Sequence, residues 1–102
     1  MNKINAVLLL CFSCSVHALP AFTPESIPKN LRVYDDSGNS YVDLVVSDCA
    51  TSGQYYLSPS HPKYDAIFSL LLAAQTSEKG VVIRFDGCTG GGQGIIKGAF
   101  LK

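Results

Sequence analysis

The chain has 102 residues, of which 47% are hydrophobic and 16% are charged, and its eight basic and eight acidic side chains give a formal net charge of zero. This length is enough for one small domain. Because there is no surplus of basic residues, nucleic acid is not an expected partner.

The first 18 residues are predicted to be a signal peptide that is cleaved after Ala18. Residues 1–3 are a short positive start, residues 4–14 form an apolar core, and residues 16–18 supply small side chains at the cleavage site. The apolar run is too short to span a bilayer, so no membrane span is expected in the mature chain. The predicted product is a secreted or periplasmic protein.

An extended lead-in is expected over residues 19–30, which contain three prolines, and a single domain over residues 31–102. The domain begins with two alternating apolar segments, residues 31–34 and 41–46. Residues 36–39 have the composition of a turn between them. These features predict a β-hairpin.

The register of this hairpin is predicted by placing Asp35 opposite Ser40, which sets Val33 opposite Val42 with both side chains inward. The same register brings four outward side chains together as the pairs Tyr34–Tyr41 and Arg32–Asp43. These four residues are the candidate binding surface, with the tyrosines as a platform for a sugar ring. Simple packing between the strands is the other interpretation of the tyrosine pair.

The rest of the chain predicts a third strand at residues 54–57, a helix within residues 62–80, and strands at residues 81–86 and 95–101. The glycine-rich residues 89–94 are expected to form a hairpin loop. This order predicts a mainly β, α+β domain: a small five-stranded OB-fold-like barrel with the helix between strands three and four. An open α+β sheet is the alternative.

The helix has a predicted inner face and an additional apolar surface. The inner face consists of Tyr64, Ile67, Phe68, Leu71 and Ala74. Four further residues form a candidate oligomer interface, because exposed apolar patches usually mark contacts between proteins: Leu70, Leu72, Ala66 and Ala73. The alternative is that the lead-in, with Phe22 and Ile27, folds back over the leucines.

Two cysteines remain after removal of the signal peptide, Cys49 and Cys88, and in an exported protein they predict one intramolecular disulfide. Closing a loop of about 40 residues would stabilise the fold by about 4 kcal/mol in the chain-entropy model. A metal site is disfavoured because the two cysteines lack a nearby pair of histidines.

No catalytic residues, cofactor or metal are predicted. The mature chain has one histidine, His61, and its neighbour Ser60 at the start of a helix is more typical of a cap than of a nucleophile with its base. We therefore expect a protein that is not an enzyme.

The whole layout resembles a known group of proteins. The hairpin, Cys49, residues 55–57, the helix over residues 64–79 and the strand that leads to Cys88 look like small secreted bacterial proteins. These are similar in layout to the B subunits of pentameric bacterial toxins, most closely the subtilase cytotoxin type. The resemblance implies an OB-fold with one helix and one disulfide, and a pentameric ring that binds cell-surface glycans. Cys49 and Cys88 correspond to the bridge of that family, and no sugar-contacting residue is matched.

Two functions remain open. The first is a non-enzymatic binding module, oligomeric like the toxin B subunits, that recognises a glycan. The second is a solitary periplasmic or secreted domain with a structural or inhibitory role that binds a protein partner.

Overall fold

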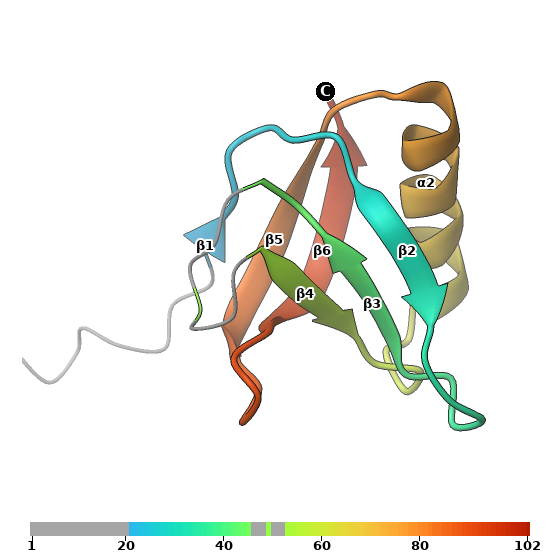
Figure 1. Cartoon of the computed structure of the whole chain (residues 1–102), viewed down its shortest axis with the longest axis vertical. Coiled ribbons are helices and arrows are strands. Elements are labelled where there is room, and N and C mark those ends of the chain that lie inside the picture. The colour runs from blue at the N-terminus through green and yellow to red at the C-terminus, as the bar shows by residue number, and fades with distance from the viewer. Residues whose placement is uncertain (1–20, 46–48, 50–52) are drawn as a thin grey trace, which may run out of the picture.

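The computed structural model describes residues 21–45, residue 49 and residues 53–102, so the predicted signal peptide lies outside the described residues. Six strands and one helix follow one another along the chain (Figure 1). They are β1 (Ala21–Phe22), β2 (Lys29–Val33), β3 (Ser40–Asp43), β4 (Gln54–Leu57), α2 (Tyr64–Ser77), β5 (Val81–Cys88) and β6 (Gly94–Leu101). Within this part of the chain, no helix is long and apolar enough to cross a membrane.

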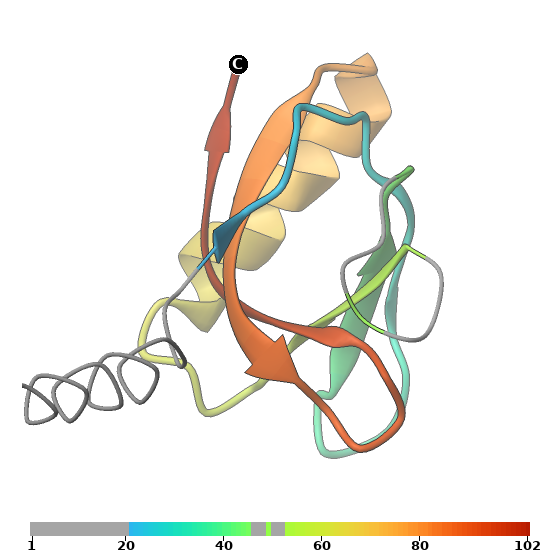
Figure 2. The same cartoon turned by 90° about the vertical axis from the view of Figure 1, so that its left-hand side faces the viewer.

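The strands form one mixed sheet in the order β1-β5-β6-β4-β3-β2. All neighbouring strands are antiparallel except β4 and β6, which pair in parallel. The sheet curves strongly, and α2 lies along one side of it, beside β2 and β6 (Figures 1 and 2). The predicted α+β class is therefore confirmed.

The prediction of a closed five-stranded barrel is wrong, because the sheet is open and has six strands. Closure would require β2 to pair with β5, but the lead-in occupies that edge of β5. Ala21 pairs with Phe85, and the backbone of Ser26 exchanges hydrogen bonds with Val81. The helix consequently follows the fourth strand, not the third, since the lead-in adds β1 before the hairpin.

The other edge of the sheet, β2, is covered at one point by the helix. The side-chain carbonyl of Gln75 on α2 accepts a hydrogen bond from the backbone N–H of Leu31 (2.8 Å). Side chains that occupy the hydrogen-bonding groups of an edge strand hinder its pairing with another chain. Lead-in and helix thus each cover one open edge of the sheet.

The core lies between the helix and the inner face of the sheet. Ile67, Leu71 and Ala74 are the buried residues of α2, and they pack with side chains from β3, β4, β5 and β6. The periodicity of the sequence predicted this face correctly. The helix ends at Ser77, because Glu78 takes the left-handed conformation (φ 56°) and the Lys79 N–H donates to the carbonyl of Ala74.

The register predicted for the hairpin is wrong by two residues: Val33 lies opposite Ser40, not Val42. The turn is longer than predicted, because the Tyr34 N–H donates to the Asn39 carbonyl (2.6 Å). Asp35 belongs to this turn, where its carboxylate accepts from the backbone N–H of Asn39 (3.3 Å). A slip of two residues keeps the side chains on their faces, so Val42 is still fully buried. Val33, which was predicted to face inward as well, lies at the end of the edge strand and is 52% exposed.

A β-bulge changes the inward side chains of β6. Phe85 pairs with Ile96 and Arg84 with Gly98, which leaves Lys97 as the extra residue. Beyond it Ala99 packs against the core, and Phe100 is exposed on the outer face. Ile96 and Phe100 therefore lie on opposite faces of β6, although simple alternation would place them on one face.

The predicted disulfide between Cys49 and Cys88 is confirmed, with the two Cα atoms 5.9 Å apart. It joins the end of β5 to the connection between β3 and β4. The bridge closes a loop with a sequence separation of 39 residues.

Candidate functional site

A row of tyrosines crosses the outer face of three neighbouring strands. Tyr34 follows β2, Tyr41 lies on β3 and Tyr56 on β4, where Tyr41 and Tyr56 are paired residues. The ring centroids are 5.8 Å apart between Tyr34 and Tyr41 and 5.3 Å apart between Tyr41 and Tyr56. Tyr34 is 73% exposed, and its ring stands edge-on to that of Tyr41. We call these three residues the tyrosine row.

The loop between β2 and β3 holds one end of this row in place. The Tyr56 hydroxyl donates to the side-chain oxygen of Asn39 (2.7 Å). Asn39 is itself bonded through its amide to the carboxylate of Asp35 (3.1 Å). The turn therefore fixes the hydroxyl of Tyr56, while the Tyr56 ring contacts the ring of Tyr41.

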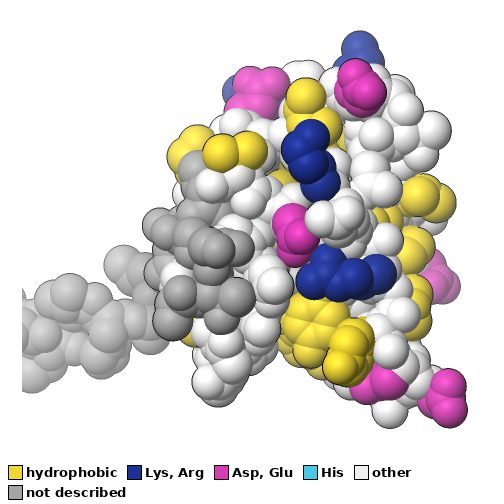
Figure 3. All heavy atoms as spheres, viewed as in Figure 1, with side chains coloured by type: hydrophobic (Ala, Val, Ile, Leu, Met, Phe, Trp, Pro, Cys, Tyr) yellow, Lys and Arg dark blue, Asp and Glu magenta, His cyan; other side chains and the backbone are white. Residues whose placement is uncertain are grey.

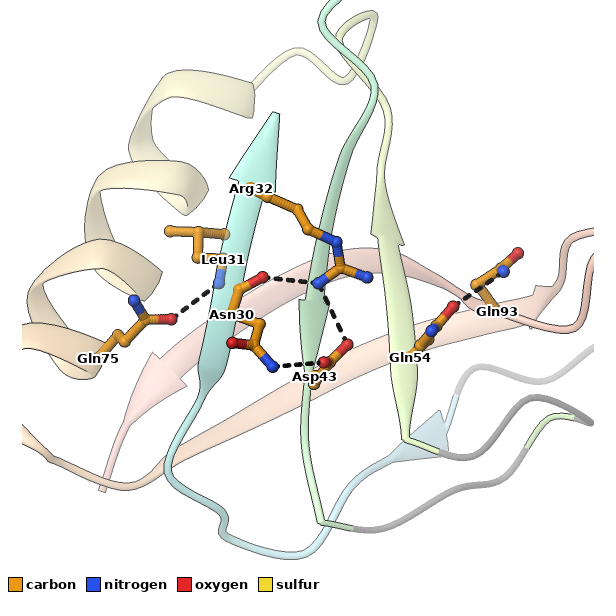
Figure 4. Close-up of polar contacts among 7 residues, drawn as sticks. All are labelled: Asn30, Leu31, Arg32, Asp43, Gln54, Gln75 and Gln93. Atoms are coloured by element: carbon orange, nitrogen blue, oxygen red, sulfur yellow. Dashed lines mark hydrogen bonds and ion pairs between the residues drawn. The ribbon is translucent and has the colours of Figure 1, made fainter. Parts of the chain in front are cut away.

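A second row, of polar side chains, crosses the same strands (Figure 4). Its members are Arg32, Asp43, Gln54 and Gln93, and we call it the polar row. Asp43 and Gln54 are paired across β3 and β4, and the Gln93 side-chain amide donates to the side-chain oxygen of Gln54 (3.1 Å). Gln93 is held in turn by Thr89, whose hydroxyl donates to its side-chain oxygen. The loop between β5 and β6 thus forms one end of the row.

Arg32 and Asp43 form the charged end of the polar row. Nη1 of Arg32 lies 3.3 Å from Oδ1 of Asp43 and donates to the Asn30 carbonyl (2.6 Å). The Asn30 side-chain amide donates to the other carboxylate oxygen of Asp43 (3.0 Å). The Arg32 guanidinium also lies 5.7 Å from the centre of the Tyr41 ring, a cation–π distance. These contacts hold the guanidinium of the polar row next to the Tyr41 ring of the tyrosine row.

The backbone of Asn30 is in the left-handed region (φ 53°), within an irregularity of β2 between Lys29 and Arg32. Asparagine tolerates this conformation better than most residues other than glycine. The irregular pairing places both the carbonyl and the side chain of Asn30 next to the charged pair.

The charged pair contributes little to stability. The Arg32 and Asp43 side chains are 36% and 30% exposed, and ion pairs this close to solvent typically contribute about 0–1 kcal/mol. The more important effect of this pair is local charge balance, because the negative charge of Asp43 compensates the positive charge of Arg32.

Several hydrogen-bond donors of the polar row are left for a ligand. Nε and Nη2 of Arg32 have no partner among the described residues, and the same holds for the amide nitrogen of Gln54. A guanidinium has five N–H donors and an amide has two, so these groups can bind acceptors from solvent or from a ligand.

Two shallow hollows lie over the rows, and Arg32 lines both of them. The first, here the asparagine hollow, has a volume of about 410 Å³ and is lined by Asn30, Leu31, Arg32 and Asp43. The second, the tyrosine hollow, has a volume of about 340 Å³ and is lined by Arg32, Tyr34, Tyr41, Gln54 and Gln93. On this face Figure 3 shows hydrophobic side chains next to basic and acidic ones.

The four residues of the candidate binding surface therefore come together on one face. Tyr34 contacts Tyr41, and Arg32 contacts Asp43, although each pair is diagonal across the strands because of the two-residue change in register. Sequence reasoning missed Asn30, Gln54, Tyr56 and Gln93. The alternation of residues 54–57 placed Gln54 and Tyr56 on one face of a strand, but no signal indicated that this strand pairs with β3.

Three of the four residues of the candidate oligomer interface are exposed: Ala66, Ala73 and Leu72, the last at 48%. Leu70 is partly buried and packs against the core. The alternative that the lead-in covers these leucines is not what the structure shows, because the lead-in runs along β5 and leaves Leu72 exposed. Assembly through this side of the helix stays a prediction.

His61 has a structural position. Its Nδ1 accepts a hydrogen bond from the Lys63 N–H (2.9 Å), so its Nε2 is the nitrogen that donates to the carbonyl of Lys97 (3.0 Å) in the bulge of β6. The Ser60 hydroxyl pairs with that of Ser58 (2.8 Å). Among the residues that the structure describes, no three His, Cys, Asp or Glu side chains gather as they would around a metal ion.

No protein-family model, no curated protein and no solved structure matches this chain.

Proposed function

We propose that this protein is an exported, non-enzymatic module that binds glycans through the tyrosine row and the polar row. The observation that carries the proposal is the placement of exposed and half-buried aromatic rings directly beside side chains whose hydrogen-bond donors have no partner among the described residues. A sugar ring has the complementary chemistry, with C–H groups on its faces and hydroxyls around its edge. Binding sites commonly combine aromatic surfaces with a few polar groups that fix the orientation of the ligand.

The strand arrangement supports an OB-fold-like site. Without β1, the order becomes β5-β6-β4-β3-β2, with α2 between β4 and β5. OB-folds bind oligosaccharides and oligonucleotides on the face of their second and third strands and with the loops between strands one and two and between strands four and five. In that correspondence these strands are β3 and β4, which carry Tyr41 and Tyr56, and the two loops supply Asn39 and Gln93.

A saccharide suits this face better than an oligonucleotide. Binding to a phosphate backbone depends on several lysines or arginines that replace its counterions. At this site Asp43 compensates Arg32, and Asp35 and Asp36 lie in the adjoining loop. The charge of the face therefore offers no general attraction for phosphates.

Export is part of the proposal, on the basis of the predicted signal peptide and of the disulfide. Structural disulfides persist in oxidising compartments such as the periplasm and the extracellular space.

The test is a glycan panel probed with the protein purified from the periplasm or the medium. We expect selective binding that Tyr34→Ala or Tyr41→Ala weakens and that Tyr34→Phe retains, because the ring face survives in phenylalanine. Arg84→Ala is the control, since Arg84 is an exposed arginine on β5 that does not line either hollow. Absence of binding across the panel would overturn the proposal and favour a solitary domain with a protein partner.

A further inference from the structure

We infer that the ligand of this face is an uncharged saccharide of at least two linked units, one in each hollow, with Arg32 in contact with both. This inference rests on the proposed glycan-binding function and specifies its ligand. The asparagine hollow and the tyrosine hollow adjoin one another and share Arg32 as a common wall.

Arg32 is prepared for contact with two units. Its Nη1 is held by the Asn30 carbonyl and by Asp43, and its guanidinium plane is near the Tyr41 ring. Nε and Nη2 have no partner within the described part of the chain. A side chain that is already fixed in this way loses less conformational entropy when a ligand binds.

The two hollows differ in chemistry. The tyrosine hollow combines the rings of Tyr34 and Tyr41 with the amide of Gln54, so one sugar unit would stack there and donate or accept hydrogen bonds at its edge. The asparagine hollow has no aromatic side chain among its lining residues. A unit in that hollow would be held by hydrogen bonds to Asn30 and Asp43, whose carboxylate oxygens can each accept a further bond.

The charge of the face favours a neutral ligand. Asp43 lies 3.3 Å from Arg32 and faces the asparagine hollow, where it would repel an acidic group. The hydroxyls of a neutral saccharide would contact an ion pair, Arg32–Asp43, whose charges compensate each other. Such contacts involve little long-range electrostatic energy, so the affinity for the saccharide should depend only weakly on salt concentration.

Calorimetric titration tests this inference with free glucose, galactose, mannose and N-acetylglucosamine and with their neutral disaccharides and trisaccharides. We expect at least one disaccharide to bind about tenfold or more tightly than its component monosaccharides, a gain of about 1.4 kcal/mol. The matching trisaccharide should bind at most about twofold more tightly than the disaccharide, because the two hollows described on this face would already be filled.

Two variants assign the units to the hollows. Tyr34→Ala should weaken the monosaccharide and the disaccharide by the same factor, so the ratio of their Kd values stays constant. Asn30→Gly should reduce that ratio towards one, because it removes the side chain from the asparagine hollow. Glycine adopts the positive φ of this position without strain, and the backbone carbonyl that holds Arg32 is retained.

The outcomes separate this inference from the proposed function. If none of these saccharides and no member of the panel binds, both are wrong. If a monosaccharide binds as tightly as its disaccharide, or if Asn30→Gly weakens both by the same factor, only the two-unit inference is overturned. A marked preference for acidic saccharides with a strong dependence on salt would overturn its statement about charge.

Discussion

Gly94 lies at the start of β6 against the ring of Tyr55, and replacing it by alanine should destabilise the fold measurably. It pairs with Tyr55 in the parallel part of the sheet. A Cβ atom at Gly94 would lie 2.6 Å from two ring carbons of Tyr55, which is only 1% exposed. The Tyr55 ring cannot move away easily, because it packs against Phe85 with 5.4 Å between the ring centroids.

The expected loss for Gly94→Ala is about 1–3 kcal/mol, the usual cost of overpacking a core. We expect a value near the lower end of this range. Alanine reduces the conformational entropy of the unfolded chain, and this effect offsets about 0.4–1 kcal/mol of the loss. For a domain of this size each 1 kcal/mol lowers Tm by about 4–8 °C. Urea denaturation followed by circular dichroism would measure the change in the free energy of unfolding.

Gly80→Ala is the matched control. A Cβ there also meets atoms that are too close, but they belong to the flexible Glu25 side chain, which is exposed and can rotate away. Its free energy of unfolding should change by about 0.5 kcal/mol or less. Equal stabilities of Gly94→Ala and the unmodified protein, or an equal loss in both variants, would refute the reasoning from the buried ring.

Three further predictions concern the bridge, the sheet edge and assembly. Replacing Cys49 and Cys88 together by serine should cost about 2–5 kcal/mol in urea denaturation, and an unchanged midpoint would show that the bridge adds nothing. Gln75→Ala should cost about 1 kcal/mol, because Leu31 loses its side-chain partner on the β2 edge, and hydrogen exchange at the Leu31 amide should accelerate. If the protein forms a ring through the helix, light scattering should give a multiple of the mature mass that Leu72→Glu lowers; a monomeric mass for both proteins would contradict assembly.

Sequence reasoning succeeded where the information is local. The apolar spacing identified the buried face of α2, and alternation placed Val42 inward and Tyr41 outward in β3. It also identified the cysteines that pair. The four outward residues of the hairpin were recognised as one surface because a change of two residues in register leaves the faces unaltered.

Other features depend on contacts between residues that are distant in the chain. The register followed from hydrogen bonds inside the turn, and the bulge at Lys97 reversed which residues of β6 face the core. Neither feature changes the composition of its segment, so local patterns could not reveal it.

By itself, the sequence determined the α+β class, the helix and its buried face, the disulfide and the outward position of the hairpin tyrosines. Each of these depends on periodicity or residue type, which act over a few positions. The tertiary structure alone decided that the sheet stays open, because the lead-in takes the edge of β5 that closure would need. It alone also brought Gln54, Tyr56 and Gln93 beside the hairpin, since the pairing of β3, β4 and β6 results from packing the whole core.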